Sequence, residues 1–322
     1  MNMSRFNSAE EAVARFLDPA PELERLIELH DRDGKYDPAN GPAGLRSITQ
    51  ALWVPRREDG TIIKVPDPDM DIPGRESLYG DLIRQESWSL LEALGCLDGF
   101  APLSKQYGIV FAHGTTPLYA KPNFDWIVDL VNRGLKIRDE IFMLSAPYMI
   151  RDPEVAGLDS FNARLIPQQS WQWEPPITEI VSMAWLWQHT PKPPSLERVR
   201  VTIISSSDAK TPRGPWVIPD TLDSLDAMYE CCFDPNLTVD GYDDFVVRSF
   251  PSVDAILNLV ATRRQLLRQH VVTRAFLRRK GINCQIHTIN AHTNEPQWLV
   301  LALREVAALV WALCDELGVP TN

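Results

Sequence analysis

Short apolar runs alternate with segments of helical period over most of the chain beyond residue 100. The apolar runs predict five strands, at 107–113, 140–145, 199–205, 244–249 and 284–289. Apolar residues that recur every three or four positions predict helices at 123–134, 177–189, 221–231, 260–280 and 296–317. Strands that alternate with helices form parallel sheets, because each helix carries the chain back across the sheet. The pattern therefore predicts an α/β protein with a doubly wound, mostly parallel sheet of five strands.

The first hundred residues have a different pattern and predict a helical extension. Helical spacing of apolar residues indicates two short helices, at 9–17 and 21–31, and a longer one at 77–97. Residues 56–75 are rich in proline, aspartate and glycine, which predicts a surface loop with a hairpin turn at Asp59 and Gly60. We therefore divide the chain into a helical extension with a Pro/Asp-rich loop (1–100) and an α/β domain (101–322).

Composition and charge narrow the class of protein. At 322 residues and 44% apolar residues the chain can bury a substantial core, and its net charge of −11 argues against a nucleic-acid binder. The five cysteines form no CxxC pair, which indicates neither a disulfide framework nor a zinc site. No segment has the roughly 20 apolar residues needed to span a bilayer. We expect a cytoplasmic protein that binds a small molecule, without nucleic acid, membrane or metal; homo-oligomer formation is left open.

The first predicted strand ends at a turn made of His113, Gly114, Thr115 and Thr116. Such a turn between a strand and a helix can present backbone N–H groups and the positive end of the helix to an anion. It lacks the spacing of a GxGxxG dinucleotide motif and of a Walker lysine loop. Either the glycine only permits a tight turn, or Gly114, Thr115 and Thr116 bind a small anionic or polar ligand.

Hydroxyl and charged side chains also follow the other predicted strands. Because the carboxyl ends of parallel strands meet at one edge of a sheet, these side chains can contact one ligand. An exposed turn has a similar composition, and Asp220 or Thr221 can instead cap the next helix. The ligand-binding candidates at these strand ends are Ser145, Ser205, Ser207, Arg213, Asp220, Thr221 and Ser249.

The predicted helix at 260–280 carries many cations in a protein that is acidic overall. Most of them must face solvent, since a helix of this length distributes its side chains around its circumference. Arg263, Arg264 and Gln269 lie in its N-terminal half, the end that faces the ligand in a βαβ unit. We select these three residues for anion recognition.

Two residues are candidates for acid–base catalysis. Glu179 starts a predicted helix after Thr178, where it either interacts with the helix dipole or acts as a general base. His113 ends the first strand and His292 follows the last one, and two histidines that converged on one site would strengthen a catalytic interpretation. We take His113 and Glu179 as the catalytic candidates and His292 as a ligand-binding candidate.

The order of elements from 106 to 318 resembles the YdcF/SanA/ElyC-like superfamily of Rossmann-like proteins. The likeness rests on LVNRGLKIRDEIFMLSA after the first helix, the helix-starting pair Thr178-Glu179, the turn Pro219-Asp220-Thr221, and an Arg/Gln-rich helix that leads through KGI into the last strand. It implies a Rossmann-like sheet that holds a polar, nucleotide-like or phosphate-bearing molecule at its strand ends. Members are linked to S-adenosylmethionine binding and to envelope metabolism, so S-adenosylmethionine or a nucleotide is the cofactor that the resemblance implies.

Together these features predict an enzyme, a transferase or hydrolase, that acts on a polar, anionic or nucleotide-like metabolite. Two alternatives stay open. The same site can serve a binding or regulatory protein that does no chemistry, and the helical extension can be a surface for a partner.

Overall fold

The computed structural model describes residues 6–17, 20–56, 59–60, 62, 71–114, 117–145, 179–205, 221–233, 248–291 and 298–320. The chain forms two compact units. The helical unit consists of Met1–Ala101, Arg263–Ala275 and Asn294–Asn322, and the sheet unit of Pro102–Thr262 and Phe276–Thr293. Each unit therefore combines segments that are far apart in the sequence.

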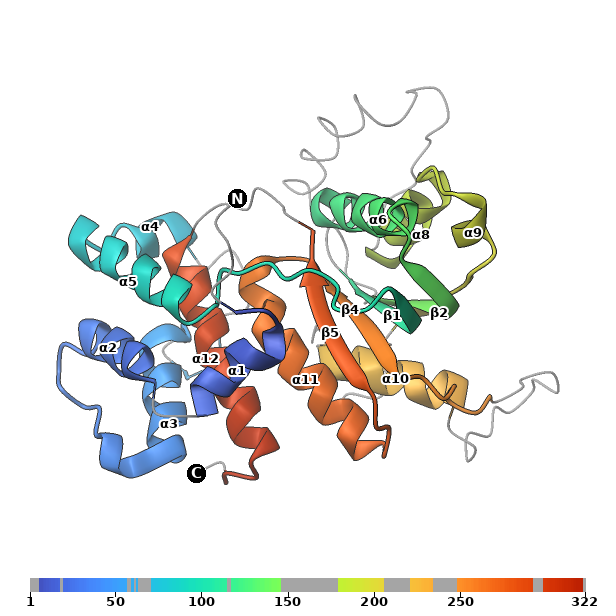
Figure 1. Cartoon of the computed structure of the whole chain (residues 1–322). Helices are drawn as coiled ribbons and strands as arrows, with labels where there is room; N and C mark the ends of the chain where they lie inside the picture. The colour runs from blue at the N-terminus through green and yellow to red at the C-terminus, as the bar shows by residue number, and fades with distance from the viewer. Residues whose placement is uncertain are drawn as a thin grey trace. The chain divides into compact units, whose positions relative to one another are not determined.

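The sheet unit is built on five parallel strands in the order β3-β2-β1-β4-β5 (Figure 1). Their bounds are Gln106–His113 (β1), Lys136–Ser145 (β2), Arg200–Ser205 (β3), Ala255–Val260 (β4) and Gln285–Asn290 (β5). The chain proceeds outward from β1 through β2 to β3 and then returns to the other side of β1. This order confirms the predicted doubly wound α/β fold, in which the reversal point lies between β1 and β4.

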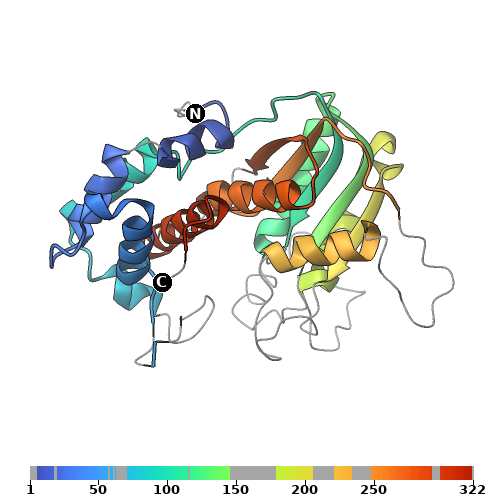
Figure 2. The same ribbon diagram turned by 90° about the horizontal axis from the view of Figure 1, so that it is seen from below.

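Helices cover both faces of the sheet (Figures 1 and 2). One face packs against α6 (Pro117–Asn132) and α8 (Glu179–His189), with the short α9 (Pro194–Glu197) before β3. The other face packs against α10 (Thr221–Phe233), which contacts β2 and β3. Side chains alternate between the two faces along each strand. Ala112 and Met143 pack under α6 and α8, whereas Phe142 contacts Phe233 of α10.

The fourth strand is not where the sequence pattern predicted it. Of the predicted strand at 244–249, residues 244–247 lie outside the described residues, and Arg248 and Ser249 are not in a strand. The fourth strand is Ala255–Val260, which pairs with β1 and is buried along its whole length. A fully buried strand has no alternation of polar and apolar residues, so the AILNLV sequence was not recognised as a strand. That helix, α11, begins at Leu266 and ends at Arg279.

The helical unit contains the two short helices predicted near the N-terminus, α1 (Ala9–Leu17) and α2 (Pro21–His30). Residues predicted as one helix at 77–97 form α5 only over Asp81–Ala93. An antiparallel bridge between Arg56 and Ile62 spans the predicted turn at Asp59 and Gly60. The predicted loop at 56–75 was wrong at its end, because Ile72–Glu76 forms the short helix α4, capped by the Asp71 side chain.

A longer helix of this unit was also not predicted from the sequence. It is α3 (Gly41–Trp53), which follows a 3-10 turn at Pro38–Asn40 and packs against α12 (Leu299–Glu316). Two glycines and a proline near its start are typical of a turn, so the helical spacing of its apolar residues was not recognised. The core of the unit combines apolar residues of α1, α2, α3, α5 and α12 with the first half of α11.

A charged network also joins elements of the helical unit. The Arg274 guanidinium donates to Glu10 Oε1 at 2.8 Å and to Glu316 Oε2 at 2.5 Å, and Glu10 Oε2 lies 2.6 Å from His270 Nε2. Burial lowers the pKa of His270, which favours a neutral ring whose Nε2–H donates to the Glu10 carboxylate. This hydrogen bond and those from Arg274 bring the pKa of Glu10 down to about 2. None of the described helices is both long enough and apolar enough to cross a membrane.

Candidate functional site

The C-terminal ends of β1 and β2 lie side by side and bring two predicted site residues together. His113 pairs with Leu144 in the register of the two strands, and the Gly114 N–H donates to the Leu144 carbonyl oxygen at 2.5 Å. Gly114 therefore continues the strand pairing by one residue and lies against Ser145, the last residue of β2. Ser145 is buried, with 1% of its surface exposed.

Glu179 completes this cluster, which consists of Gly114, Ser145 and Glu179. It is the first residue of α8, as the sequence predicted, and its carboxylate is half-buried. The Ser145 hydroxyl donates to Glu179 Oε1 at 3.1 Å. A charged carboxylate at this position is also stabilised by the partial positive charge at the start of its own helix.

Gly114 leaves the space that the carboxylate occupies. A Cβ atom built on Gly114 would overlap with Glu179 Oε1 and would lie 2.7 Å from the Leu144 carbonyl oxygen and 3.0 Å from Ser145 Cα. Only glycine lets the carboxylate and the end of β2 approach the backbone this closely. Close packing around Glu179 is therefore the observed role of Gly114.

The second catalytic candidate, His113, is buried in a different polar cluster. Its Nε2 atom lies 2.6 Å from Asn258 Oδ1, and Asn258 Nδ2 donates to Thr288 Oγ1 at 3.2 Å. Because an amide oxygen can only accept, we assign the proton to His113 Nε2. The chain of hydrogen bonds crosses β1, β4 and β5 and fixes the orientation of the imidazole ring.

Strand alternation places the two catalytic candidates on opposite faces of the sheet. Gly114 and Ser145 each follow by two residues a side chain that packs under α6 and α8, namely Ala112 and Met143, so they lie on the same face of the sheet. His113 directly follows Ala112, so its side chain points to the other face of the sheet, the α10 side, together with that of Asn258. The two candidates lie at the same edge of the sheet, but their side chains are not directed toward each other.

The remaining candidates are distributed as follows. Ser205 is the last residue of β3, and Thr221 is the first residue of α10, so the predicted start of that helix is correct. Ser249 was chosen as a strand end, which is wrong, because it is exposed and precedes β4. Six candidates lie outside the described residues: Thr115, Thr116, Ser207, Arg213, Asp220 and His292.

Arg263, Arg264 and Gln269 belong to the helical unit. The two arginines lie in a 3-10 turn, Arg263–Gln265, that leads into α11. Gln269 is 6% exposed, and its Oε1 atom has no hydrogen-bond partner in the part of the chain that the structure describes. Gln269 is thus an interior residue of this unit, which its position in an Arg-rich helix did not indicate.

Three polar residues that are not among the selected site residues are buried in the sheet unit: Asn258 within β4, Thr262 just after β4, and Asn290 at the end of β5. Asn258 has no exposed surface. Thr262 Oγ1 and Asn290 Oδ1 are buried without a hydrogen-bond partner among the described residues, although Asn290 Nδ2 donates to the Ala291 carbonyl. Buried polar atoms without partners are rare in folded proteins, and a bound ligand or water can satisfy them. The signal available in the sequence was an asparagine in the middle of an apolar strand.

Comparisons with known proteins do not assign the chain to a family. No protein-family model matches the chain, and no curated protein is significantly similar to it. The resemblance to the YdcF/SanA/ElyC-like superfamily therefore stays a prediction. Within the described ranges, no three His, Cys, Asp or Glu side chains are grouped so that they could hold a metal ion.

Proposed function

We propose that this chain is a cytoplasmic enzyme that transfers or hydrolyses a group on a small polar metabolite, with Glu179 as its acid–base residue. The observation that carries the proposal is the cluster of Gly114, Ser145 and Glu179 at the C-terminal edge of a doubly wound sheet. In folds of this type ligands bind at that edge, next to the reversal of strand order. The proposal is compatible with a divergent member of the YdcF/SanA/ElyC-like superfamily.

The charge of Glu179 restricts how a ligand can approach. A carboxylate repels a phosphate placed directly against it, but it accepts a hydrogen bond from a hydroxyl or an amine. We therefore expect a nucleotide-like or sugar-like ligand to present a hydroxyl group to Glu179, with any anionic group farther away. In group transfer the carboxylate would remove the proton from this hydroxyl as its oxygen attacks the transferred group of a donor molecule, and the bond between that group and its leaving group would break. In hydrolysis it would remove a proton from a water molecule that attacks in the same way.

His113 has a different role in this proposal. Its Nε2–H is engaged by Asn258, and its side chain faces the α10 side of the sheet. We propose that it helps to shape and polarise the sheet edge and that Glu179 moves the proton. Replacement of His113 should then reduce activity less than replacement of Glu179.

The test uses the full chain and a fractionated metabolite extract. Consumption of a metabolite is followed by mass spectrometry with the wild-type protein, with Glu179→Gln and with Ser145→Ala. Glu179→Gln keeps the shape of the side chain and removes the base, so turnover should fall by about 100-fold or more, as for other general bases. Ser145→Ala should cause a smaller loss. Unchanged turnover with Glu179→Gln would exclude Glu179 as the acid–base residue.

A binding protein without catalysis is the second candidate. The buried Thr262 Oγ1 and Asn290 Oδ1 support it, because such groups recognise a ligand but do not transfer protons readily. S-adenosylmethionine or a nucleotide would then raise the unfolding temperature through mass action and would be recovered unchanged. Conversion of the added compound, or no stabilisation by any of these compounds, would argue against this candidate.

A further inference from the structure

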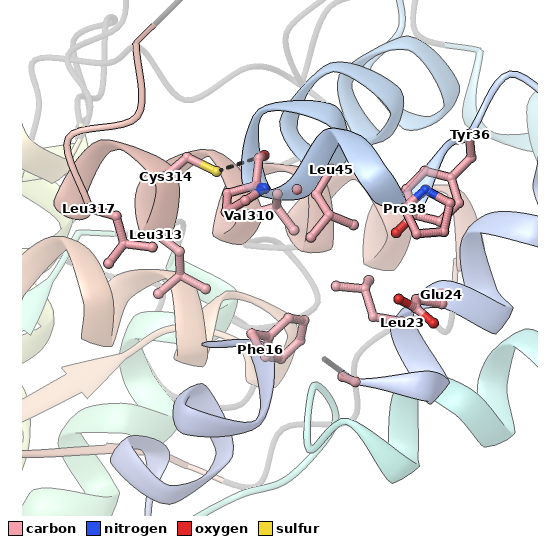
Figure 3. Close-up of a pocket in the computed structure, with 13 residues that line it drawn as sticks. Phe16, Leu23, Glu24, Tyr36, Pro38, Leu45, Val310, Leu313, Cys314 and Leu317 are labelled. Atoms are coloured by element: carbon pink, nitrogen blue, oxygen red, sulfur yellow. Dashed lines mark hydrogen bonds between the residues drawn. The ribbon is translucent and has the colours of Figure 1, made fainter. Parts of the chain in front are cut away.

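The helical unit contains an apolar cavity that is separate from the cluster around Glu179 (Figure 3). Its volume is about 210 Å³, and α1, α2, α3, α12 and the segment around Tyr36 form its walls. An engineered cavity of about 150 Å³ lined by apolar side chains is large enough to bind benzene. This cavity can therefore hold a small aromatic ring or a short alkyl chain.

The walls of the cavity are almost entirely apolar. Phe16 and Leu23 lie on one side of the space, and Leu45, Val310 and Leu313 lie on the other (Figure 3). The thiol of Cys314, which also lines it, donates to the Pro42 carbonyl oxygen at 3.3 Å. Apolar walls of this kind favour an apolar guest over water.

The cavity also reaches the surface of the unit. Leu317 lies at one end, and 58% of its surface is exposed, which is unusual for a leucine that lines a cavity. Pro38 and Pro42 in the wall are exposed as well. A guest could therefore enter from solvent without unfolding of the unit.

Glu24 is the only carboxylate among the described residues that line the cavity. It lies at the end where Tyr36 and Pro38 are found (Figure 3). Its carboxylate forms no ion pair and no hydrogen bond with any described residue, although other acidic residues of α1 and α2, such as Glu10 and Glu22, are paired. Glu24 is therefore a half-buried carboxylate beside an apolar wall, and no described cation balances its charge.

The charges around Tyr36 also favour a cation at this end of the cavity. Burial raises the pKa of the Tyr36 hydroxyl, and the negative charges of Glu24, Glu28 and Asp37 raise it further. Lys35, the cation nearest to Tyr36 in the sequence, forms an ion pair with Asp33 at 2.7 Å. The potential at this end of the cavity is therefore negative.

We propose that this cavity binds a small hydrophobic cation, with its alkyl or aromatic part among Leu23, Leu45 and Leu313 and its ammonium group on Glu24. The apolar part is recognised by burial, and the charged part by a carboxylate that has no other partner. A neutral analogue of the same length should bind more weakly, and an anionic analogue should bind more weakly still. This site lies wholly within the helical unit and does not depend on the proposed enzymatic function.

The probes are n-hexylammonium, 1-hexanol and hexanoate, which share one alkyl chain and differ in charge. Dissociation constants for the full chain are measured by ligand-observed NMR at pH 7 and low ionic strength. An ion pair that is partly exposed favours the amine over the alcohol by about threefold to fivefold. This preference should decrease with added salt, because salt screens charges near the surface.

Two variants separate the apolar and charged parts of the proposal. Glu24→Gln should remove the preference for the amine and leave the affinity for 1-hexanol within about twofold, a change that corresponds to less than half a kcal/mol. Glu92→Gln, on the exposed face of α5, removes one negative charge elsewhere in the unit. It should change neither the preference for the amine nor the affinity for 1-hexanol. Ala20→Leu adds volume to the cavity wall and should weaken all probes together.

The outcomes decide the proposal in either direction. Binding of the amine above the alcohol, lost in Glu24→Gln and kept in Glu92→Gln, supports it. Absence of binding by all three probes overturns it, and so does a preference for the amine that persists in Glu24→Gln. If Ala20→Leu does not fold, the comparison of Glu24→Gln with Glu92→Gln still decides the result.

Discussion

The close approach of the Glu179 carboxylate to Gly114 makes Gly114→Ala the most informative single substitution. The added Cβ atom would lie 2.7 Å from the Leu144 carbonyl oxygen and 3.0 Å from Ser145 Cα. The Glu179 side chain can rotate away, but the Leu144 oxygen belongs to the backbone of β2 and can move only with the strand. The substitution should therefore displace the carboxylate and separate the ends of β1 and β2.

The expected cost follows from two opposing effects. Overpacking of a tight site costs about 1–3 kcal/mol, whereas replacing glycine by alanine restricts the unfolded chain and returns about 0.4–1 kcal/mol. From the middle of these two ranges, the net destabilisation is about 1–2 kcal/mol. For a unit of this size the unfolding temperature falls by about 2–4 °C for each kcal/mol, so we expect a decrease of roughly 2–8 °C.

Thermal unfolding followed by circular dichroism measures this decrease. Gly80→Ala is the control, because a Cβ atom at Gly80 meets no atom within 4 Å and its φ of −66° suits any residue. The double variant Gly114→Ala/Glu179→Ala should recover part of the loss, since one of the overlapping groups is then absent. An unfolding temperature of Gly114→Ala equal to that of the wild type would refute the described packing.

Three further predictions concern charged and polar groups. The pKa of Glu10 is about 2 in the folded protein, compared with 4.5 for an ordinary glutamate, so its contribution to stability is complete above pH 4.5 and is lost as the pH falls toward 2. Glu10→Gln should therefore flatten the acid side of a plot of unfolding temperature against pH; an unchanged slope between pH 5 and 2 would exclude this contribution. Glu140 is buried and accepts two hydrogen bonds from Arg248, at 2.7 and 3.2 Å. Arg248→Met leaves that carboxylate without its cation and should cost about 3 kcal/mol in urea unfolding, and Glu140→Gln in the same chain should restore part of it. Asn258→Ala removes the hydrogen bonds to His113 and Thr288 and should cost about 1–3 kcal/mol by the same measurement; stability equal to that of the wild type would mean that these bonds contribute nothing.

Most of the sheet could be predicted from the sequence, because four of its strands have clear ends. The strands β1, β3 and β5 begin and end within one residue of their predicted bounds, whereas β2 begins at Lys136, four residues before the predicted start at 140. The fourth strand could not be predicted in this way. AILNLV is compatible with a strand or with the start of the next helix, and only its pairing with β1 determines which one forms.

The candidate site was predicted in part. Gly114, Ser145 and Glu179 were selected because each lies at a strand end or a helix start, and the structure brings these three together. His113 met the same criterion, yet it faces the opposite side of the sheet and binds Asn258. A position at a strand end gives the edge of the sheet but not the face to which a side chain is directed, and one residue of register reverses that face.

The sequence by itself determined the parallel α/β class and the approximate positions of most elements, because the period of apolar residues reports how each segment is buried. Only the tertiary structure decided which elements share a core. The C-terminal helix α12 packs with the N-terminal helices, and together they enclose the cavity beside Glu24. Local patterns show that a helix has an apolar face, but they do not identify the face it packs against, since contacts between distant residues depend on the free energy of the whole fold.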